Sequence, residues 1–484
     1  FNAWQEQIAY IPPMLLISAY IFKNVISSVT DITSDSFYNQ YIAPNLGNTS
    51  LIPPYISQLE ELKKENNGFN DLHIHLNGTM ETDSVWLDIL HYPERVIHNM
   101  EESAKGNKLA KEQYEQFDNW TRPDKLKHLI TQAINLREFL FSKICKVVPV
   151  IESFTRQAES SLYISVLHYL SMYPDNKEVA SSFHHYLLIL GLVNQMLVQQ
   201  PQCFGFEQFQ QSNGLREYSE QEYEQRFLQL AGNQLDNIKI IEGRFSPKDK
   251  EYKNNYLIDK IRRGWLLLNN RQGCNKSDIR LIAHFIKRAD KQKKDIRFKE
   301  LRLKNKKICE ALISLRNSGS KNGKAIVGID AAASEFDTPP EVFAPVFKKL
   351  RKKGFQHFTY HAGEDFYHLL GGLRAIYEAI TFLDLQRGDR IGHATAAGVD
   401  PEIWVHNVGC EVVVPIGAYM DDLLFVYYLI SNNECKALDS LMPRLYMRIT
   451  ELSREIYPND DFQVYDLIYA WKRRQEDILE LADS

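Results

Sequence analysis

The chain has 484 residues and a formal net charge of −5, and 44% of its residues are hydrophobic and 25% charged. These values are typical of a soluble globular protein with room for one large domain with insertions or for two to three domains. The negative net charge gives no reason to expect that the protein surface as a whole binds nucleic acid. Basic runs such as Lys304–Lys307, with Lys287 and Lys291–Lys294 nearby, are typical of a solvated helix face.

The six cysteines are scattered and include no Cys-x-x-Cys pair. This pattern argues against a thiolate zinc site and a disulfide framework, and it predicts a cytoplasmic protein. The apolar run Tyr10–Phe22 contains Pro12 and Pro13 and is too short to span a bilayer, so we expect no membrane association.

Two helical regions flank the first predicted strand. Residues 1–67 are interrupted by prolines and rich in aromatic residues, which indicates a helical N-terminal extension. Residues 81–230 repeat apolar side chains every three or four positions, and this periodicity predicts a large helical insertion.

Between these regions, the sequence Asp71-Leu72-His73-Ile74-His75-Leu76-Asn77-Gly78 predicts a short strand that ends in a turn. Side chains alternate along a strand, so His73 and His75 share one face and could bind one metal ion. A pair of ordinary histidines on a polar sheet face is the alternative.

From residue 231 to about 420, short apolar runs alternate with helical patterns. The runs predict further strands at Asn237–Phe245, Ile279–Ile286, Ala325–Asp330, Phe355–His361, Asp389–Gly392 and Cys410–Pro415. Repeated strand-then-helix units imply a parallel sheet, and their number favours a TIM-type (β/α)8 barrel made of residues 68–80 and 231–420. Residues 421–484 return to helical patterns, so the barrel stops one strand short within this sequence.

Polar residues gather at the carboxyl ends of the predicted strands, where such barrels keep their active sites. They are His73, His75, Glu242, Arg244, Ser246, Asp330, His361, Glu364 and His393. Zinc takes imidazole ligands and lowers the pKa of a bound water molecule, which favours hydrolytic attack on an unsaturated or carbonyl-like carbon. Glu364 would then move a proton, and His393 would orient the attacking oxygen.

The ordered set of motifs Asp71–Gly78, Glu242–Pro247, Val327–Glu335, His361–Glu364 and Gly392–His393 resembles the successive signatures of the adenosine deaminase family. The resemblance implies a barrel of the amidohydrolase kind with one Zn²⁺ per chain, bound by His73, His75 and His361. It also implies that Glu364 protonates the purine ring nitrogen and that His393 positions the attacking group. Asn77, Asp330 and Ala333 would bind the substrate, although Asn77 and Ala333 stand where the family usually has Asp and Gly.

The large insertion and the N-terminal extension are more similar to the divergent deaminase subunit of the RADAR antiphage system than to a housekeeping enzyme. This likeness implies adenosine, deoxyadenosine or an adenine nucleotide as substrate, a large homo-oligomer and an ATPase partner subunit. It leaves RNA open as a further substrate.

The family's last strand ends in a paired-Asp motif whose first Asp completes the metal site. Asp421-Asp422, Asp439 and Asp460-Asp461 each lie in or beside helical patterns and lack a preceding strand. We expect the missing ligand to lie in a segment outside this sequence, because every other catalytic position is kept. Three functions stay open: an adenine-specific deaminase, an aminohydrolase acting on another purine or an amide, and an inactive barrel serving as a structural shell or binding module.

Overall fold

A computed structural model describes residues 11, 13–28, 31–42, 57–76, 82–94, 97–98, 127–194, 222–231, 235–273, 277–290, 296–409 and 411–483. The contacts within the chain divide it into two compact units. The helical unit comprises Phe1–Ile241 and Lys260–Ile279, and the sheet unit comprises Glu242–Asp259 and Arg280–Ser484.

Helices build most of the helical unit and enclose an apolar core of their own. Helix α9 (Arg156–Met172) begins where the Thr155 side chain accepts a hydrogen bond from the Ala158 N–H. Residues 158–166 are all buried, so this part of the helix is enclosed on all its faces. The other helices of this unit are α2 (Pro13–Asn24), α3 (Asp35–Phe37), α5 (Ser57–Asn66), α6 (Thr82–His91), helical residues 127–144, α10 (Lys177–Asn194) and α12 (Tyr223–Ala231), together with the C-terminal part of α13 (Glu251–Gln272).

A buried polar network crosses this helical core. Glu159, which is 1% exposed, pairs with the Arg137 guanidinium at 3.0 Å and accepts a hydrogen bond from the Tyr186 hydroxyl. The Trp86 indole N–H donates to the same hydroxyl at 2.8 Å. The network satisfies the buried charges, and it ties α6, α9, α10 and residues 127–144 together.

Among the described residues, the strands are hydrogen-bonded in the order in which they follow one another along the chain, from β1 to β6. The pairs β3–β4, β4–β5 and β5–β6 are parallel. Strands β4 and β5 are almost wholly buried, as is typical of a parallel sheet that is covered on both faces. The strands are β1 (Phe69–His75), β2 (Ile238–Phe245), β3 (Asp278–Ile286), β4 (Ile326–Ala332), β5 (His357–Ala362) and β6 (Arg390–His393).

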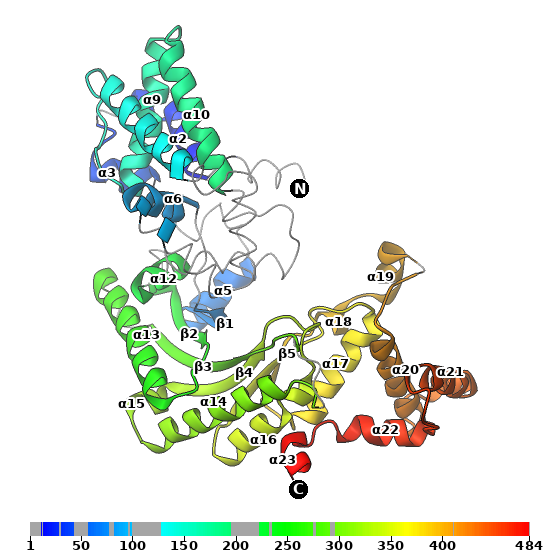
Figure 1. Cartoon of the computed structure of the whole chain (residues 1–484). Coiled ribbons are helices and arrows are strands. Elements are labelled where there is room, and N and C mark those ends of the chain that lie inside the picture. The colour runs from blue at the N-terminus through cyan, green and yellow to red at the C-terminus, as the bar shows by residue number, and fades with distance from the viewer. Residues whose placement is uncertain are drawn as a thin grey trace. The chain divides into compact units, whose positions relative to one another are not determined.

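Helices connect the strands of the sheet unit, and α14, α16 and α17 lie along the sheet (Figure 1). The Phe347 ring of α16 packs against Phe285 of β3 and against Phe358 and Tyr360 of β5, at centroid distances of 6.4, 5.5 and 6.1 Å. The helices are the N-terminal part of α13, α14 (Lys299–Asn317), α15 (Lys321–Ala325), α16 (Ala344–Lys352), α17 (Leu369–Phe382), α18 (Thr395–Gly398) and α19 (Pro401–Val408).

The predicted α/β architecture with parallel strands is therefore confirmed, and six predicted strands occur within a few residues of their expected positions. Closure into an eight-stranded barrel stays a prediction. The predicted strand at Cys410–Pro415 is wrong for residues 411–415, which form no strand. Val413 is 94% exposed and Val412 and Val414 are half-buried, and among the described residues this run pairs with no strand.

The C-terminal helices α20 (Ile416–Ser431), α21 (Met442–Ile456) and α22 (Val464–Arg473) share a second apolar cluster, and α23 (Ile478–Asp483) follows them. Within the sheet unit, two ion pairs join these helices to each other and to α17. Arg374 of α17 pairs with Asp422 of α20 at 2.7 Å, and Arg474 pairs with Asp421 at 2.7 Å. These contacts fix α20 against α17.

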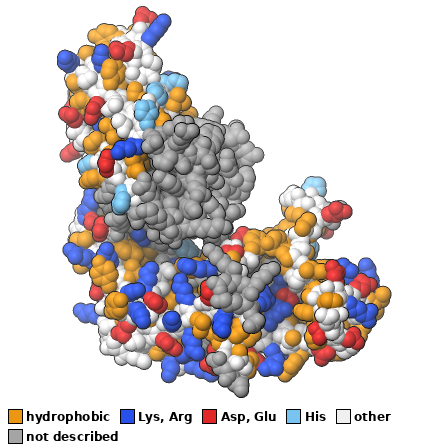
Figure 2. Space-filling model, in the orientation of Figure 1, with side chains coloured by type: hydrophobic (Ala, Val, Ile, Leu, Met, Phe, Trp, Pro, Cys, Tyr) orange, Lys and Arg blue, Asp and Glu red, His pale blue; other side chains and the backbone are white. Residues whose placement is uncertain are grey.

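Acidic and basic side chains are mixed over the visible face of the segment that carries α13 to α16 (Figure 2). Lys304 and Lys307 are exposed on α14, as expected for a solvated helix face, whereas Lys291–Lys294 lie outside the described residues. Lys287 departs from that expectation, because it is 3% exposed and follows strand β3. Within the described ranges, no helix has the length and apolar character needed to cross a membrane.

The Glu159 network gives a stability prediction. We expect Glu159→Ala to destabilise the protein by about 3–5 kcal/mol, because it leaves the buried Arg137 charge without its partner. Glu178→Ala is the matched control: it removes an exposed pair with Lys143 and should cost less than about 1 kcal/mol. Chemical denaturation followed by circular dichroism measures the free energy of unfolding of both variants. An equal decrease in the two would contradict a special role of the buried Glu159–Arg137 pair in stability.

Candidate active site

Parallel pairing brings the carboxyl ends of three strands of the sheet unit together. His361 is opposite Gly392 in the β5–β6 register, and Ala362 is opposite His393. Asp330 lies near the end of β4, the neighbouring strand. A ring nitrogen of His361 lies within 4.8 Å of one of His393, and the ring centroids are 5.1 Å apart.

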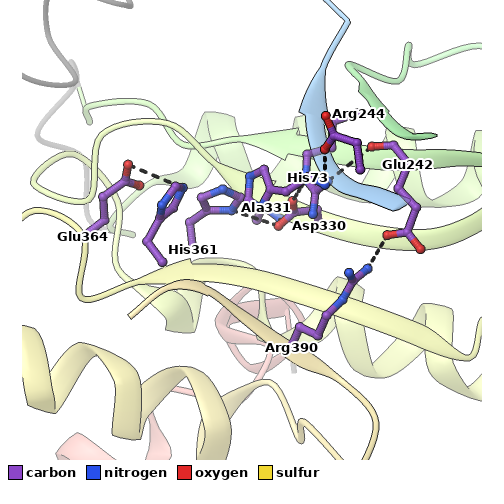
Figure 3. A network of polar contacts seen from close by, with 10 residues as sticks. His73, Glu242, Arg244, Asp330, Ala331, His361, Glu364 and Arg390 are labelled. Atoms are coloured by element: carbon purple, nitrogen blue, oxygen red, sulfur yellow. Dashed lines mark hydrogen bonds and ion pairs between the residues drawn. The ribbon is translucent and has the colours of Figure 1, made fainter. Parts of the chain in front are cut away.

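A buried chain of three side chains fixes His361 (Figure 3). The Arg244 Nε donates to Asp330 Oδ2 at 2.6 Å, and Asp330 Oδ1 lies 3.1 Å from His361 Nδ1. All three residues are at most 2% exposed. Burial alone would raise the pKa of Asp330, but the His361 ring and the Arg244 guanidinium hold that pKa well below its usual range.

The Asp330 carboxylate is fully engaged. Besides these two partners, its Oδ1 accepts a hydrogen bond from the Ala331 N–H at 2.7 Å, and the residue is 0% exposed. We predicted Asp330 as a substrate-binding residue from the sequence, and this role stays a prediction; its contacts in the structure orient His361. A carboxylate that accepts a hydrogen bond from Nδ1 favours the tautomer in which Nε2 carries the lone pair of the imidazole.

Glu364 and His393 form the more accessible part of the site. Glu364 Oε1 lies 3.6 Å from His393 Nε2, and their side chains are 20% and 43% exposed. Burial raises the pKa of Glu364, and burial together with the neighbouring His361 lowers the pKa of His393. A carboxyl group that holds its proton more tightly therefore faces an imidazole that is neutral at pH 7.

The backbone at two of the predicted positions is unusual. His393 has φ +60°, and the next residue, Ala394, donates its N–H to the Gly392 carbonyl at 2.8 Å, which closes a tight turn around His393. Ala333 has φ +101°, a conformation that favours glycine. Non-glycine residues in this region are strained, and such strain clusters at functional sites.

The two charged residues near the end of β2, Glu242 and Arg244, have different partners. Arg244 belongs to the buried chain described above, whereas Glu242 forms an ion pair with Arg390 of β6 (Figure 3). Ser246 follows the strand and is half-buried. The Glu242 carboxylate is thus engaged by a guanidinium.

The first predicted strand belongs to the helical unit. His73 and His75 lie on β1, half-buried, with ring centroids 5.5 Å apart. Both rings therefore lie close to one another, as expected for residues that share a strand face. Asn77 lies outside the described residues.

The aspartates considered as the missing metal ligand either form ion pairs with arginines or lie away from a strand. Asp421 and Asp422 lie within α20 and pair with Arg474 and Arg374. Asp439 lies in a 3₁₀ helix, and Asp460 and Asp461 are exposed in a loop. Within the described part of the chain, none of them follows a strand.

Sequence reasoning gave no role to three residues of this site. His284 of β3 is opposite Asp330 in the strand register, and burial lowers its pKa to about 4. Lys287 and Glu335 contact the backbone around Glu364, as described below. The sequence pattern that could have identified His284 is a histidine within an otherwise apolar strand. Lys287 lies beside a basic run, a pattern that predicts an exposed residue.

A parallel sheet with imidazoles and carboxylates at the carboxyl ends of its strands is typical of α/β barrel proteins. Residues 293–411 match the family model described as "Adenosine deaminase". The chain is also 31% identical over 168 residues to "Adenosine deaminase" of Clostridium kluyveri, a match that covers 34% of this chain and 40% of that protein. The predicted resemblance to the adenosine deaminase family is thus confirmed over the matched segment, and the chain spans less than half the length of this relative.

The closeness of Gly392 to His361 gives a second prediction. A Cβ at residue 392 would lie 2.9 Å from His361 Cγ and Nδ1. Because Asp330 fixes that ring, we expect Gly392→Ala to destabilise the protein by about 1–3 kcal/mol. Gly398→Ala is the control, since nothing lies within 4 Å of its Cβ position. Thermal denaturation tests both, and an unchanged midpoint in Gly392→Ala would contradict this packing.

Proposed function

We propose that this protein is a zinc-dependent aminohydrolase that deaminates adenosine, deoxyadenosine or an adenine nucleotide to the inosine form. The observation that carries the proposal is the buried Arg244–Asp330–His361 chain beside Glu364 and His393. Asp330, His361, Glu364 and His393 lie within the segment that matches the adenosine deaminase model. The matched relative is covered only in part, so its activity is extended to this chain as a proposal.

The donor groups fit a zinc ion. His361 offers Nε2 because its Nδ1 is held by Asp330, the arrangement that metal-binding histidines commonly have. We propose that His73 and His75 of β1 join His361 as ligands. A bound zinc ion would lower the pKa of a coordinated water molecule toward neutrality.

The residues of the sheet unit would then perform the proton transfers. Deamination adds water to the amino-bearing carbon and releases ammonia, and the adjacent ring nitrogen must gain a proton during the addition. Glu364 is suited to donate this proton, because its raised pKa keeps the carboxyl protonated to a higher pH. Neutral His393 is suited to accept a hydrogen bond from the attacking water and so to orient it.

Asn77, Asp330 and Ala333 remain the proposed substrate-binding positions. The strained backbone of Ala333 lies just beyond β4, where its peptide would approach the purine. The larger assembly, a homo-oligomer with an ATPase partner in antiphage defence, remains a prediction from the likeness in domain organisation.

Incubation of the purified protein with adenosine, deoxyadenosine, AMP and ATP tests the activity. We expect inosine-type product from at least one of them, loss of turnover after zinc removal by a chelator, and recovery when zinc is restored. Elemental analysis should find about one zinc per chain. Turnover of only another purine or an amide would favour a different aminohydrolase, and a folded, metal-free, inactive protein would favour a scaffold.

Glu364→Gln tests the role of the acid. The substitution should lower kcat by about 10²–10⁴-fold, because the amide cannot donate the proton that the ring nitrogen needs. Zinc content should stay unchanged, since the proposed ligands are untouched. Glu402→Gln, in an exposed position on α19, is the control for a general effect of removing a carboxylate. Full activity of Glu364→Gln would refute the assignment.

A further inference from the structure

The turn His361–Glu364 leaves the sheet at the end of β5, so its backbone groups need partners outside the strand ladder. Gly363 has φ +72°, and a Cβ at this position would lie 2.7 Å from Ile376 Cδ1. Its carbonyl accepts a hydrogen bond from the Ala396 N–H at 2.8 Å. The turn that carries Glu364 is therefore packed tightly from one side.

Glu335, in the loop after β4, holds the turn from another side. Its Oε2 accepts a hydrogen bond from the Gly363 N–H at 2.8 Å, and its Oε1 accepts one from the Glu364 N–H at 2.8 Å. Both oxygens of one carboxylate are thus directed at two consecutive peptides. Charge-assisted hydrogen bonds of this kind are about twice as strong as neutral ones.

Lys287 holds the start of the same turn. Its Nζ donates to the His361 carbonyl at 2.7 Å and lies 4.5 Å from the centre of the Tyr360 ring. The residue is buried, and its own N–H donates to the Ala332 carbonyl at 2.9 Å, which extends the β3–β4 pairing. An ammonium group is rarely buried unless its interactions compensate for the lost hydration.

A further contact joins the two loops that supply these side chains. The Thr338 hydroxyl accepts a hydrogen bond from the Arg288 N–H and donates to the Arg288 carbonyl, both at 2.7 Å. Thr338 is 1% exposed. The loop after β3 and the loop after β4 are thereby fixed relative to each other, next to Lys287 and near Glu335.

We propose that Glu335 and Lys287 are positioning residues that clamp the His361–Glu364 turn and set the place of the Glu364 carboxyl. The inference rests on the proposed function for its effect on turnover, and on the contacts alone for its effect on the backbone. Neither residue needs to touch the substrate. A displacement of about 1 Å at a reacting group can cost about 10²-fold in rate, which is the scale of effect that a lost clamp should have.

Amide hydrogen exchange tests the clamp without any assay of activity. In Glu335→Ala, we expect the Gly363 and Glu364 amides to exchange at least about tenfold faster than in the unaltered protein, since both lose their acceptor. Asp337→Asn is the matched control, because it alters a carboxylate of the same loop and should leave these two amides unchanged. Unaltered exchange in Glu335→Ala would overturn the clamp, whether or not the protein deaminates adenine compounds.

Steady-state kinetics test the positioning role. Glu335→Ala should lower kcat by about 10²-fold with little change in KM, and Glu335→Gln, which keeps one acceptor oxygen, should retain an intermediate kcat. Lys287→Met should lower kcat in the same way, whereas Lys287→Arg, which keeps a donor, should recover part of it. Faster exchange with an unchanged kcat would overturn the positioning role, and an inactive unaltered protein would instead refute the proposed function.

Discussion

The buried carboxylate of Asp330 is the constraint on which the rest of the site depends. An ionised group with no exposed surface is strongly unfavourable unless other groups compensate for its lost hydration. Arg244 of β2, His361 of β5 and the Ala331 N–H provide that compensation, and each comes from a fixed place in the sheet. The same contacts that make the buried charge tolerable therefore set the ring orientation of His361. Stability of the sheet and geometry of the site are two results of one set of interactions.

The strained residues at the ends of β4 and β6 fit this view. His393 and Ala394 at the end of β6 and Ala333 after β4 have positive φ values, which cost free energy for residues with a Cβ. Such conformations persist where surrounding contacts leave the chain no alternative. Here the contacts are the β5–β6 register, which brings Gly392 next to His361, and the hydrogen bond that closes the turn around His393. The turn presents the His393 ring toward Glu364 at the more exposed end of the buried chain.

Much of the fold and several site residues could be predicted from the sequence, and the failures have physical causes. Apolar runs predicted the buried strands well, because a central parallel strand is apolar on both faces. The same criterion failed at residues 411–415, which pair with no described strand and of which Val413 is 94% exposed. Polar residues at strand ends predicted a cluster of His361, Glu364 and His393, which the structure brings close together, whereas the basic composition around Lys287 gave no sign that this residue is buried. A lysine within a basic run is expected to have a solvent-exposed side chain. Only the path of the chain after β3 shows that Lys287 is buried.

The paired aspartates Asp421 and Asp422 show why residue type alone does not identify a metal ligand. A carboxylate that completes a metal site must direct an oxygen at the ion and be free of competing cations. Asp422 instead pairs with Arg374, which also pairs with Glu378, and the Trp471 indole N–H donates to Glu378 at 2.7 Å. Asp421 pairs with Arg474 through both of its oxygens. These contacts link α17, α20 and the end of α22, and removing Asp421 would take away the ion-pair partner of Arg474, whereas removing Asp422 would leave Arg374 paired with Glu378 alone. The pair therefore serves the attachment of the C-terminal helices, and a carboxylate ligand for the proposed zinc would have to come from another part of the protein.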